Sequence, residues 1–567
     1  RLYALSNVGS LLGLVTYPFL VEPVLALKTQ AYSWACGYVV FAVCAVYGAL
    51  RTMRLNAAPT GRAVISKARS PVREEARPGV GVRIFWVALS ACASVVLLAT
   101  TNQISQEIPA GPFLWVLPLA LYMLSFILCF SSKRWYFRTA YTAAFFIGTL
   151  TFCWVFYGGG TLLAQIGVYS LVLFICCMIC HGELARLKPH PRYLTQFYLL
   201  VSAGGVLGGI AVNLVAPRVF TDFLELPVGL LGCWGLLLIV FAGDWRSDRN
   251  RWASRLTDTL LMGGIGMLGV VLFLSINRSS VNVLNASRNF YGVLRVRETN
   301  LDEPHQHAYE LAHGATLQGF QYLDEEKRRL PTAYYTEESG AGLALLHHPQ
   351  RDAGLRIGVV GLGVGTLATY GRPGDTIRFY EINPEVIRLA EGQGGYFTYL
   401  EECPAQVEIV LGDARISMER ELAAGDSQQF DLLVVDAFLG DAVPVHLLTK
   451  EAFDTYLRHL QPDGVMALHI SSYWMDLRPV VQELADYFHL GTALINSGGD
   501  GERVFGSDWM LVTRSEEFLE QPEIAGRSSP RQSCAGFRLW TDDYSSVFQT
   551  LKRGQSSGGL LEGFESP

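Results

Sequence analysis

A glycine-rich turn and an acidic residue lie at a spacing typical of a nucleotide-like cofactor site. Gly361, Gly363 and Gly365 follow an apolar run, and alternate glycines let the backbone turn tightly and leave its amide groups facing a ligand. Glu381 lies 381 − 361 = 20 residues beyond the first glycine, at the tip of the next predicted strand, where a carboxylate can accept both ribose hydroxyls. NAD-binding domains share these features, so they leave the nucleotide open.

Asp413 and Asp436 distinguish between the candidate cofactors. Asp413, in the sequence LGDAR, ends the third predicted strand, where its side chain can reach an adenine amino group. Asp436, in the sequence VVDAFLGDAVP, ends the fourth strand, beside the reacting centre. NAD-dependent enzymes do not need this pair, whereas S-adenosyl cofactors use it. Helix N-capping is the alternative interpretation of both aspartates, but their register with the glycine turn and Glu381 favours an adenosyl sulfonium cofactor.

Alternating strands and helices are predicted from Leu355 onward, and they bring these residues to one edge of a sheet. A doubly wound parallel sheet binds its ligand at the carboxyl ends of its strands, where the acidic residues lie. The predicted strands cover 356–361, 376–382, 407–413, 430–438, 464–471, 492–497 and 509–514. Upstream, residues 291–298 and 316–323 alternate like strands of a small β region.

The first half of the chain is far more apolar than the second. The whole sequence of 567 residues is 50% hydrophobic and only 17% charged, and one membrane span needs about 20 mostly apolar residues. Nine candidate spans cover 4–26, 31–50, 82–101, 112–130, 139–157, 161–180, 194–216, 226–243 and 258–277. We therefore expect a multi-pass protein of a bacterial inner membrane, with the lipid bilayer as a partner.

The loops between these spans alternate between basic and nonbasic. Lys and Arg gather in 51–83, 131–138, 181–192 and 243–255, whereas 101–111 and 158–160 have none. Basic loops stay on the cytoplasmic side of a membrane, so the span 258–277 would leave the C-terminal domain on the far side. A cytosolic pool of cofactor would instead favour a domain on the cytoplasmic side of the membrane. The sequence does not decide between these two sides.

The apolar half also contains two similar segments, called here the two copies of an internal echo. The sequence YALSNVGSLLGL at position 3 and the sequence YLLVSAGGVLGG at position 198 each contain a small-xxx-small step, which lets two helices approach closely. Gly9 and Gly13 of the first copy align with Gly204 and Gly208 of the second. Copies separated by about six spans are the plan of major-facilitator transporters. A chance likeness of glycine-rich helices is the alternative.

The composition predicts an order of regions and excludes one class of partner. The chain begins at Arg1 inside an apolar run, so we expect the natural protein to extend further at its N-terminus. The net charge of −6 argues against nucleic acid as a partner. We expect transmembrane helices in 1–50, a basic cytoplasmic linker in 51–81, transmembrane helices in 82–277, a small β-rich substrate-side region in 278–354, a Rossmann-like domain in 355–553 and a disordered tail in 554–567.

Eleven cysteines are present, and most of them lie inside the candidate spans. There they are expected to serve as small, soft packing residues. Residues 177–181 fit the C-x-x-C-H pattern of haem attachment, but a helix end rich in small residues is the favoured interpretation. The sequence therefore predicts no metal site.

Seven short motifs between about Asn289 and Ser472 carry a family resemblance. They are FYGVLRV at 290, GFQ at 319, AYYTEE at 333, GLGVG at 361, FYEINPEVI at 379, LGDAR at 411 and VVDAFLGDAVP at 434. Together they resemble the polyamine aminopropyltransferases, the spermidine and spermine synthases. The whole chain is similar to bacterial proteins that fuse a multi-span, transporter-like region to such a domain. The resemblance implies a doubly wound sheet of the class I S-adenosylmethionine-methyltransferase type and a homodimer formed through the β-rich region.

The resemblance also implies roles for particular residues. The family's co-substrate is decarboxylated S-adenosylmethionine, so the glycine turn and Glu381 would hold its sugar, and Asp413, with Ala414 beside it, would contact adenine. Asp436 matches the catalytic base, which takes or orients the proton of the attacking amine. The residues that match the amine site are Asp441, Tyr335 and Gln321.

Two positions depart from the family pattern. In true synthases the glycine turn contains an aspartate that grips the ammonium of the aminopropyl group, and here that position is Val364. The family also has an aspartate two residues after the acid that matches Glu381, and here that position is Asn383. The leading hypothesis is a membrane-anchored, spermidine-synthase-like aminopropyltransferase acting on a polyamine. The alternatives are a methyltransferase that uses intact S-adenosylmethionine and a noncatalytic polyamine or nucleoside sensor on a transporter.

Overall fold

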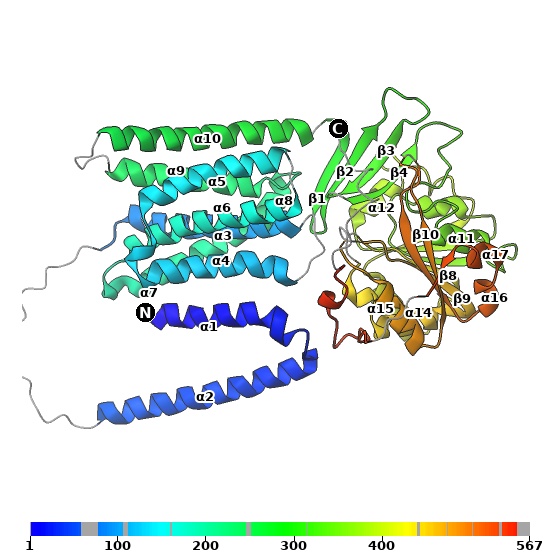
Figure 1. Cartoon of the computed structure of the whole chain (residues 1–567), viewed down its shortest axis with the longest axis horizontal. Coiled ribbons are helices and arrows are strands. Elements are labelled where there is room, and N and C mark those ends of the chain that lie inside the picture. Colours follow the sequence, from blue (N-terminus) through cyan, green and yellow to red (C-terminus); the bar gives the residue numbers. More distant parts are fainter. Residues whose placement is uncertain are drawn as a thin grey trace, which may run out of the picture.

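The computed structural model describes residues 2–57, 77–105, 112–158, 161–244, 251–279, 281–314, 316–438, 443–472, 474–501, 503–531 and 536–552. Most of the expected basic linker (51–81) and all of the expected tail (554–567) lie outside these residues. Within them, a layer of long helices adjoins a domain built on two β-sheets (Figure 1).

Long apolar helices form the first half of the described chain. They are α1 (Leu2–Thr16), α2 (Leu27–Ala57), α3 (Val80–Ser105), α4 (Pro112–Ser131), α5 (Arg138–Gly158), α6 (Leu162–Arg186), α7 (Leu194–Ile210), α8 (Ala216–Val219), α9 (Glu225–Asp244) and α10 (Arg251–Ser279). Eight helical segments of the described chain are long and apolar enough to cross a membrane, and a shorter apolar helix covers Asn7–Val21. Helix α3 contacts α4, α6, α7 and α9 and so lies at the centre of the bundle, whereas α2 lies apart from it (Figure 1).

Gly204 and Gly208 of α7 lie directly against the backbone of α3. A Cβ atom at Gly208 would lie 2.6 Å from the carbonyl oxygen of Ala91, and one at Gly204 would collide with the carbonyl oxygen of Val87. A larger side chain at either position would therefore push the two helices apart. The aligned Gly13 of α1 has nothing among the described residues within 4 Å of such an atom. The small-xxx-small step thus brings helices together in the second copy of the echo and not in the first.

A second likeness between the two copies is visible only in the structure. Each copy continues into a π-helical turn of 5 residues, at Tyr17–Val21 and at Ala211–Val215. The two turns are 211 − 17 = 194 residues apart, one fewer than the 198 − 3 = 195 that separates the sequence copies. Because π-helical turns are rare, their recurrence at matching places supports a true internal repeat.

A small antiparallel sheet links the helices to the main domain. Its strands, in the order β1-β2-β3-β4, are β1 (Val283–Asn289), β2 (Gly292–Thr299), β3 (Ala308–His313) and β4 (Thr316–Tyr322). Each strand pairs with the next along the chain, as short connections between antiparallel strands allow.

The main sheet has the order β12-β10-β11-β9-β8-β5-β6-β7. Its strands are β5 (Arg356–Val360), β6 (Thr376–Glu381), β7 (Gln406–Leu411), β8 (Phe430–Val435), β9 (Leu460–His469), β10 (Gly491–Ser497), β11 (Ser507–Thr513) and β12 (Ser528–Ser529). The helices around it are α11 (Gly340–Leu346), α12 (Pro384–Ala390), α13 (Ala414–Ala423), α14 (Lys450–His459), α15 (Arg478–Tyr487), α16 (Glu516–Leu519) and α17 (Pro522–Ala525). This is the doubly wound, Rossmann-like sheet that the sequence predicts.

One strand of the main sheet departs from the predicted parallel arrangement. Strand β11 runs antiparallel to both β9 and β10. The physical reason is its connection: β11 follows β10 without a crossover helix, and a direct return reverses the strand direction. Strands β5 to β9 remain parallel.

Both faces of the parallel strands are covered, which explains their continuous apolar runs. All six positions of β8 are buried. Leu432 and Val434 pack in the core on one face, and Leu433 and Val435 pack in the core on the other. This two-sided burial fixes the strand ends, from which the acidic residues project.

Polar contacts hold the domain against one end of the helices. The buried Arg288 of β1 pairs with the buried Glu225 at the start of α9 and lies over the ring of Phe223, 4.2 Å from its centroid. The backbone N–H of Leu27 donates to the carbonyl oxygen of Asp543, 2.8 Å away. The contacts therefore come from the starts of α2 and α9, at the end of the bundle that faces the sheets.

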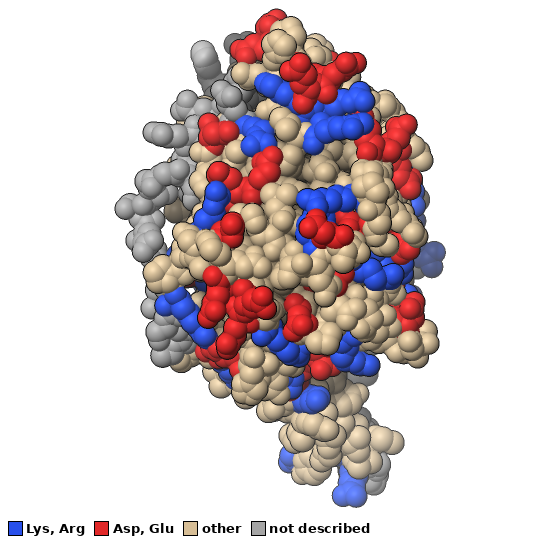
Figure 2. Space-filling model, turned by 90° about the vertical axis from the view of Figure 1, so that its right-hand side faces the viewer, with Lys and Arg blue, Asp and Glu red and all other residues tan. Residues whose placement is uncertain are grey.

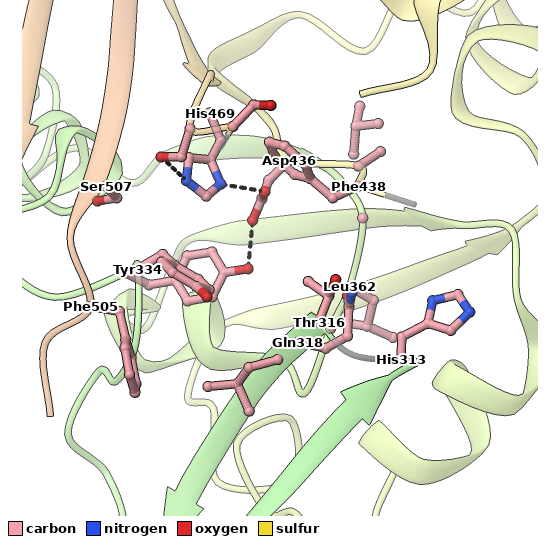
Figure 3. A pocket seen from close by; sticks show the side chains of 18 of the residues that line it. His313, Thr316, Gln318, Tyr334, Leu362, Asp436, Phe438, His469, Phe505 and Ser507 are labelled. Carbon is pink, nitrogen blue, oxygen red and sulfur yellow. Dashed lines mark hydrogen bonds and ion pairs between the residues drawn. The ribbon is translucent and has the colours of Figure 1, made fainter. Parts of the chain in front are cut away.

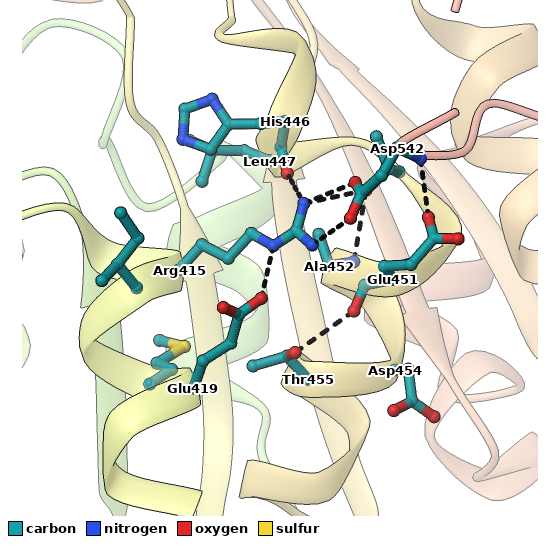
Figure 4. A network of polar contacts seen from close by, with 12 residues as sticks. Arg415, Glu419, His446, Leu447, Glu451, Ala452, Asp454, Thr455 and Asp542 are labelled. Atoms are coloured by element: carbon teal, nitrogen blue, oxygen red, sulfur yellow. Dashed lines mark hydrogen bonds and ion pairs between the residues drawn. The ribbon is translucent and has the colours of Figure 1, made fainter. Parts of the chain in front are cut away.

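The neighbouring residue Asp542 ties the C-terminal segment to the domain. Its carboxylate accepts from Arg415 at 2.5 Å and from the hydroxyl of Thr449 at 2.8 Å, while Arg415 also pairs with Glu419 (Figure 4). On the face turned away from the helices, by contrast, positive and negative side chains are interspersed (Figure 2), as is usual for a solvent-facing surface.

The packing of α7 on α3 predicts a position-specific effect of enlarging a glycine. Replacing Gly208 with leucine forces side-chain atoms into the backbone of α3, and overpacking of this kind costs about 1–3 kcal/mol or more. We expect the Gly208→Leu protein to unfold at a lower temperature in detergent than the parent chain.

The matched control is Gly13→Leu, at the aligned position where the described residues leave the space open. Its melting temperature should stay near that of the parent. Equal losses for the two variants would contradict this packing.

Candidate active site

A cavity of about 950 Å³ opens at the carboxyl ends of the parallel strands. Residues from the ends of β5, β6, β7, β8 and β9 line it, together with part of β4 and the segment between β10 and β11 (Figure 3). The cavity lies beside the point where β5 is flanked by β6 on one side and β8 on the other. Ligands of doubly wound sheets bind at this reversal of strand order.

The glycine turn forms one wall of the cavity. Gly361, Gly363 and Gly365 have φ angles of 97°, 55° and 85°, which side chains rarely tolerate. A Cβ atom at Gly361 would collide with the carbonyl oxygen of Asp436, so a glycine is needed to bring the two strand ends together. Gly361 and Gly363 line the cavity; Gly365 shapes the turn but is not among the lining residues of the described chain.

Glu381 lines the cavity with its carboxylate held in place by the backbone. One oxygen accepts from the N–H of Leu362 at 3.0 Å, and the other accepts from the N–H of Asn383 at 2.8 Å. Burial raises the pKa of Glu381, and these backbone hydrogen bonds oppose part of that rise. Each oxygen keeps a second lone pair, so the carboxylate can still accept hydroxyl groups from a ligand.

Asp413 has two local partners as well as a place in the cavity wall. One oxygen caps α13 by accepting from the N–H of Ile416 at 2.9 Å, as the capping interpretation predicts, and the other lies 2.9 Å from Nε2 of His446. The hydrogen bond with His446, followed by the backbone bonds, lowers the pKa of Asp413. Ala414 and His446 line the cavity beside it, so this edge presents a permanent negative charge.

Asp436 caps no helix in the described chain; its carboxylate is held between two side chains. The hydroxyl of Tyr335 donates to one oxygen at 2.5 Å, and Nδ1 of His469 lies 2.8 Å from the other (Figure 3). Burial, and then the carboxylate itself, raises the pKa of Tyr335 well above its usual value. The phenol therefore stays protonated and keeps the carboxylate oriented toward the cavity.

No sequence motif marks His469, whose ring lies beside the carboxylate of Asp436. Its ring stacks on Trp509 with centroids 4.5 Å apart and planes 9° apart, and Nε2 lies 2.8 Å from the hydroxyl oxygen of Ser471. That oxygen also accepts from the N–H of Asp508, and the carboxylate of Asp436, when ionised, can only accept from Nδ1. His469 then carries its own proton on Nδ1 and donates it to Asp436. The sequence feature that could have indicated this role is the position of His469 near the end of the fifth predicted strand, 464–471.

The predicted amine-site residues have different outcomes. Tyr335 lines the cavity, and its role at an amine site stays a prediction. Gln321 is buried, its amide donates to the hydroxyl of Thr398 and to the carbonyl oxygen of Arg328, both at 2.9 Å, and its role is to join β4 to a neighbouring loop. Gln321 is not among the described residues that line the cavity, so this geometry gives no support to its assignment to the amine site. Asp441 lies outside the described residues.

The two departures from the family pattern have clear positions. Val364 is buried in the main core, beside Gly319, and is not among the described lining residues. Asn383 caps α12 through its side-chain oxygen, which also accepts from Asn289 at 2.6 Å. Position 364 therefore offers no carboxylate to a cation in the cavity.

Comparison with known proteins finds two relatives that each match part of this chain. The polyamine aminopropyltransferase of Vibrio vulnificus (strain CMCP6) is 28% identical over 159 residues, which are 28% of this chain and 50% of that protein. The C-terminal domain is spermidine-synthase-like. The N-terminal histidine N-methyltransferase of Emericella nidulans is 31% identical over 121 residues, which are 21% of each chain. The chain thus spans about half the length of one of these relatives and a fifth of the other.

The chain was also compared with solved structures and with protein-family models. A probable spermidine synthase from Corynebacterium glutamicum ATCC 13032, known as a crystal structure, is 17% identical, with 46% of this chain and 98% of that chain covered and a TM-score of 0.35. No protein-family model matches the sequence.

The buried carboxylate of Glu381 predicts that nucleoside binding to the spermidine-synthase-like domain depends on pH. Ribose hydroxyls donate best to the ionised acid. Of the two acids expected to contact the nucleoside, Glu381 and Asp413, Glu381 is the first to take up a proton as pH falls, because its pKa is raised and that of Asp413 is lowered. Below that pKa, the affinity for S-adenosylhomocysteine should fall by about tenfold per pH unit. Calorimetric titrations between neutral and acidic pH measure this slope.

The matched control is Glu381→Gln, which cannot ionise. It should bind more weakly at neutral pH and show no slope over the same range. A parent protein with a flat profile would contradict the role of Glu381.

Proposed function

We propose that the spermidine-synthase-like domain transfers an alkyl group from an adenosyl sulfonium donor to an amine nitrogen. The observation that carries this proposal is the position of the Asp436 carboxylate. It faces the same cavity as the glycine turn, Glu381 and Asp413, and Tyr335 and His469 hold it there.

The reaction needs an oriented carboxylate more than a strong base. The amine lone pair attacks a carbon bonded to the positively charged sulfur, the carbon–sulfur bond breaks, and its electrons leave with the neutral thioether nucleoside. The amine then releases a proton, which Asp436 accepts or passes to solvent. The donor is already activated, so the protein contributes mainly positioning and negative charge.

The charges of the cavity wall suit two cationic reactants. The acidic side chains that line it are Glu381, Asp413, Asp436, Asp500 and Asp508, whereas Lys552 is the one Lys or Arg among the described lining residues. The Lys552 ammonium donates to the carbonyl oxygen of Ser472 at 2.7 Å. A net negative wall attracts both a sulfonium and a protonated amine.

Two groups are candidates for the transfer. The seven sequence motifs and the Vibrio relative support an aminopropyl group from decarboxylated S-adenosylmethionine, with a polyamine as acceptor. Val364 supports a methyl group from intact S-adenosylmethionine, because an aminopropyl ammonium finds no carboxylate at that position, and the Emericella relative is a methyltransferase by name. On the evidence of the chain's own residues we favour the methyl group.

Replacement of Asp436 tests the proposed chemistry. The full-length protein is offered intact or decarboxylated S-adenosylmethionine with a panel of amines, and release of adenosylhomocysteine or methylthioadenosine identifies the group that moves. Asp436→Asn should lower kcat at least 100-fold, within the roughly 10²–10⁴-fold range of general acid–base contributions. Its affinity for the nucleoside should change little.

The control is Asp454→Asn, a change of an exposed carboxylate on α14 outside the cavity wall. This variant should keep the parent rate. Full turnover by Asp436→Asn would remove that residue from the mechanism, and binding of donor and amine without any product would favour a sensor.

We further propose that the chain is a multi-pass membrane protein whose transferase domain lies on the noncytoplasmic side. The basic ends of the described helices carry Arg51, Arg54, Arg83, Lys133, Arg134, Arg138, Arg186, Lys188, Arg192 and Arg251. The sheets adjoin the opposite end (Figure 1), where the helix ends and loops of the described chain carry fewer basic residues, namely Lys28, Arg218 and Arg278. Because basic loops stay in the cytoplasm, the domain belongs on the other side.

Reporter fusions at the C-terminus test this orientation in a bacterial host. Alkaline phosphatase folds only outside the cytoplasm, so its fusion after residue 567 should be active, while a green fluorescent protein fusion at the same place should stay dark. Matched fusions in the basic loop 51–83 should show the reverse. Fluorescence from the C-terminal fusion would contradict the proposed side.

A further inference from the structure

Four buried cysteines meet at one point inside the helical bundle, far along the chain from the transferase domain. They are Cys92 of α3, Cys176 and Cys180 of α6, and Cys233 of α9. Their sulfur atoms all lie within 4.8 Å of one another. Three of the four side chains are completely buried, and Cys92 is 9% exposed.

The geometry suits one tetrahedral ion. Zinc–sulfur bonds of about 2.3 Å place the four sulfurs of a tetrahedral site about 3.8 Å apart, so a small inward movement of the thiols completes the coordination. Four sulfur ligands in a tetrahedron indicate zinc or iron–sulfur chemistry, and soft thiolates also select Cu⁺. A four-iron cluster needs wider spacing, because each of its cysteines binds a different iron atom.

Packing alone gives no reason for this convergence. Cys176 and Cys180 are four residues apart, so they lie on one face of α6, and the other two cysteines come from two further helices. The remaining buried cysteines of the described helices, Cys129, Cys153 and Cys177, are not part of the group. A small apolar residue would fill each of the four places equally well, whereas only thiols at all four supply a complete ligand set.

We propose that these four cysteines bind one closed-shell thiophilic ion, Zn²⁺ or Cu⁺, which joins α3, α6 and α9. All four ligands come from the protein, and no position is left for water, as in structural rather than catalytic sites. Binding replaces the thiol protons with the metal ion. The expected role is to hold the three helices in register, independently of transfer chemistry in the soluble domain.

Metal analysis of the full-length protein tests the site. The protein is purified in detergent without a histidine tag from cells grown with added zinc or added copper, and bound metal is measured by mass spectrometry. We expect about one ion per chain, with the two growth conditions distinguishing Zn²⁺ from Cu⁺. Stripping the ion with a chelator should lower the melting temperature, and adding the same ion back should restore it.

Alanine variants separate coordination from packing. Cys180→Ala and Cys233→Ala should lose the ion, and a chelator should no longer change their melting temperatures. Cys177→Ala, which removes a neighbouring buried thiol of the same helix outside the group, should keep one ion per chain.

The parent protein keeps the proposal falsifiable even when a variant fails to fold. Its four clustered thiols should resist maleimide until a chelator is added. A parent protein that contains no metal and is not stabilised by either ion would overturn the proposal, as would disulfides among the four cysteines or equal metal loss in Cys177→Ala.

Discussion

The candidate site of the C-terminal domain is built around one buried carboxylate, that of Asp436, each of whose oxygens has a hydrogen-bond partner. An unpaired charge in this position would cost several kcal/mol, and two partners prevent that cost: the phenol of Tyr335 and the imidazole of His469. Each partner has its own support. Trp509 stacks on the imidazole, and the glycine at 361 gives the backbone of Asp436 the room to approach β5. The strand order, the glycine turn and the stacked ring of Trp509 thus all help to position the carboxylate of Asp436.

Sequence reasoning succeeded where chemistry and periodicity coincide. The glycine turn, Glu381, Asp413 and Asp436 follow strands whose apolar runs are unambiguous, and parallel strands bring their ends to a common edge. It was less informative where tertiary contacts decide. Gln321 has a cavity-compatible side chain, but its amide is used within the fold. His469 had no local motif, because its role depends on an aspartate 33 residues earlier and on a tryptophan of an antiparallel strand.

The helical half shows the same limit in a different form. Hydropathy located the long helices and the glycine step of α7, yet it treated nine cysteines as equivalent packing residues. Only the arrangement of α3, α6 and α9 separates the four that meet from those that do not. The arrangement also bears on the side of the membrane, because the sheets adjoin the helix ends that carry fewer basic residues. In the proposed orientation, the proposed donor has to reach the cavity from the noncytoplasmic side.

The most direct test of the central claim is a cryo-electron microscopy map of the full-length protein in lipid nanodiscs with saturating S-adenosylhomocysteine. The account predicts density for the nucleoside across the carboxyl ends of β5 to β8, with the ribose on Glu381, the base near Asp413 and the sulfur facing Asp436. An empty cavity at saturating ligand, or a nucleoside bound elsewhere on the chain, would contradict it.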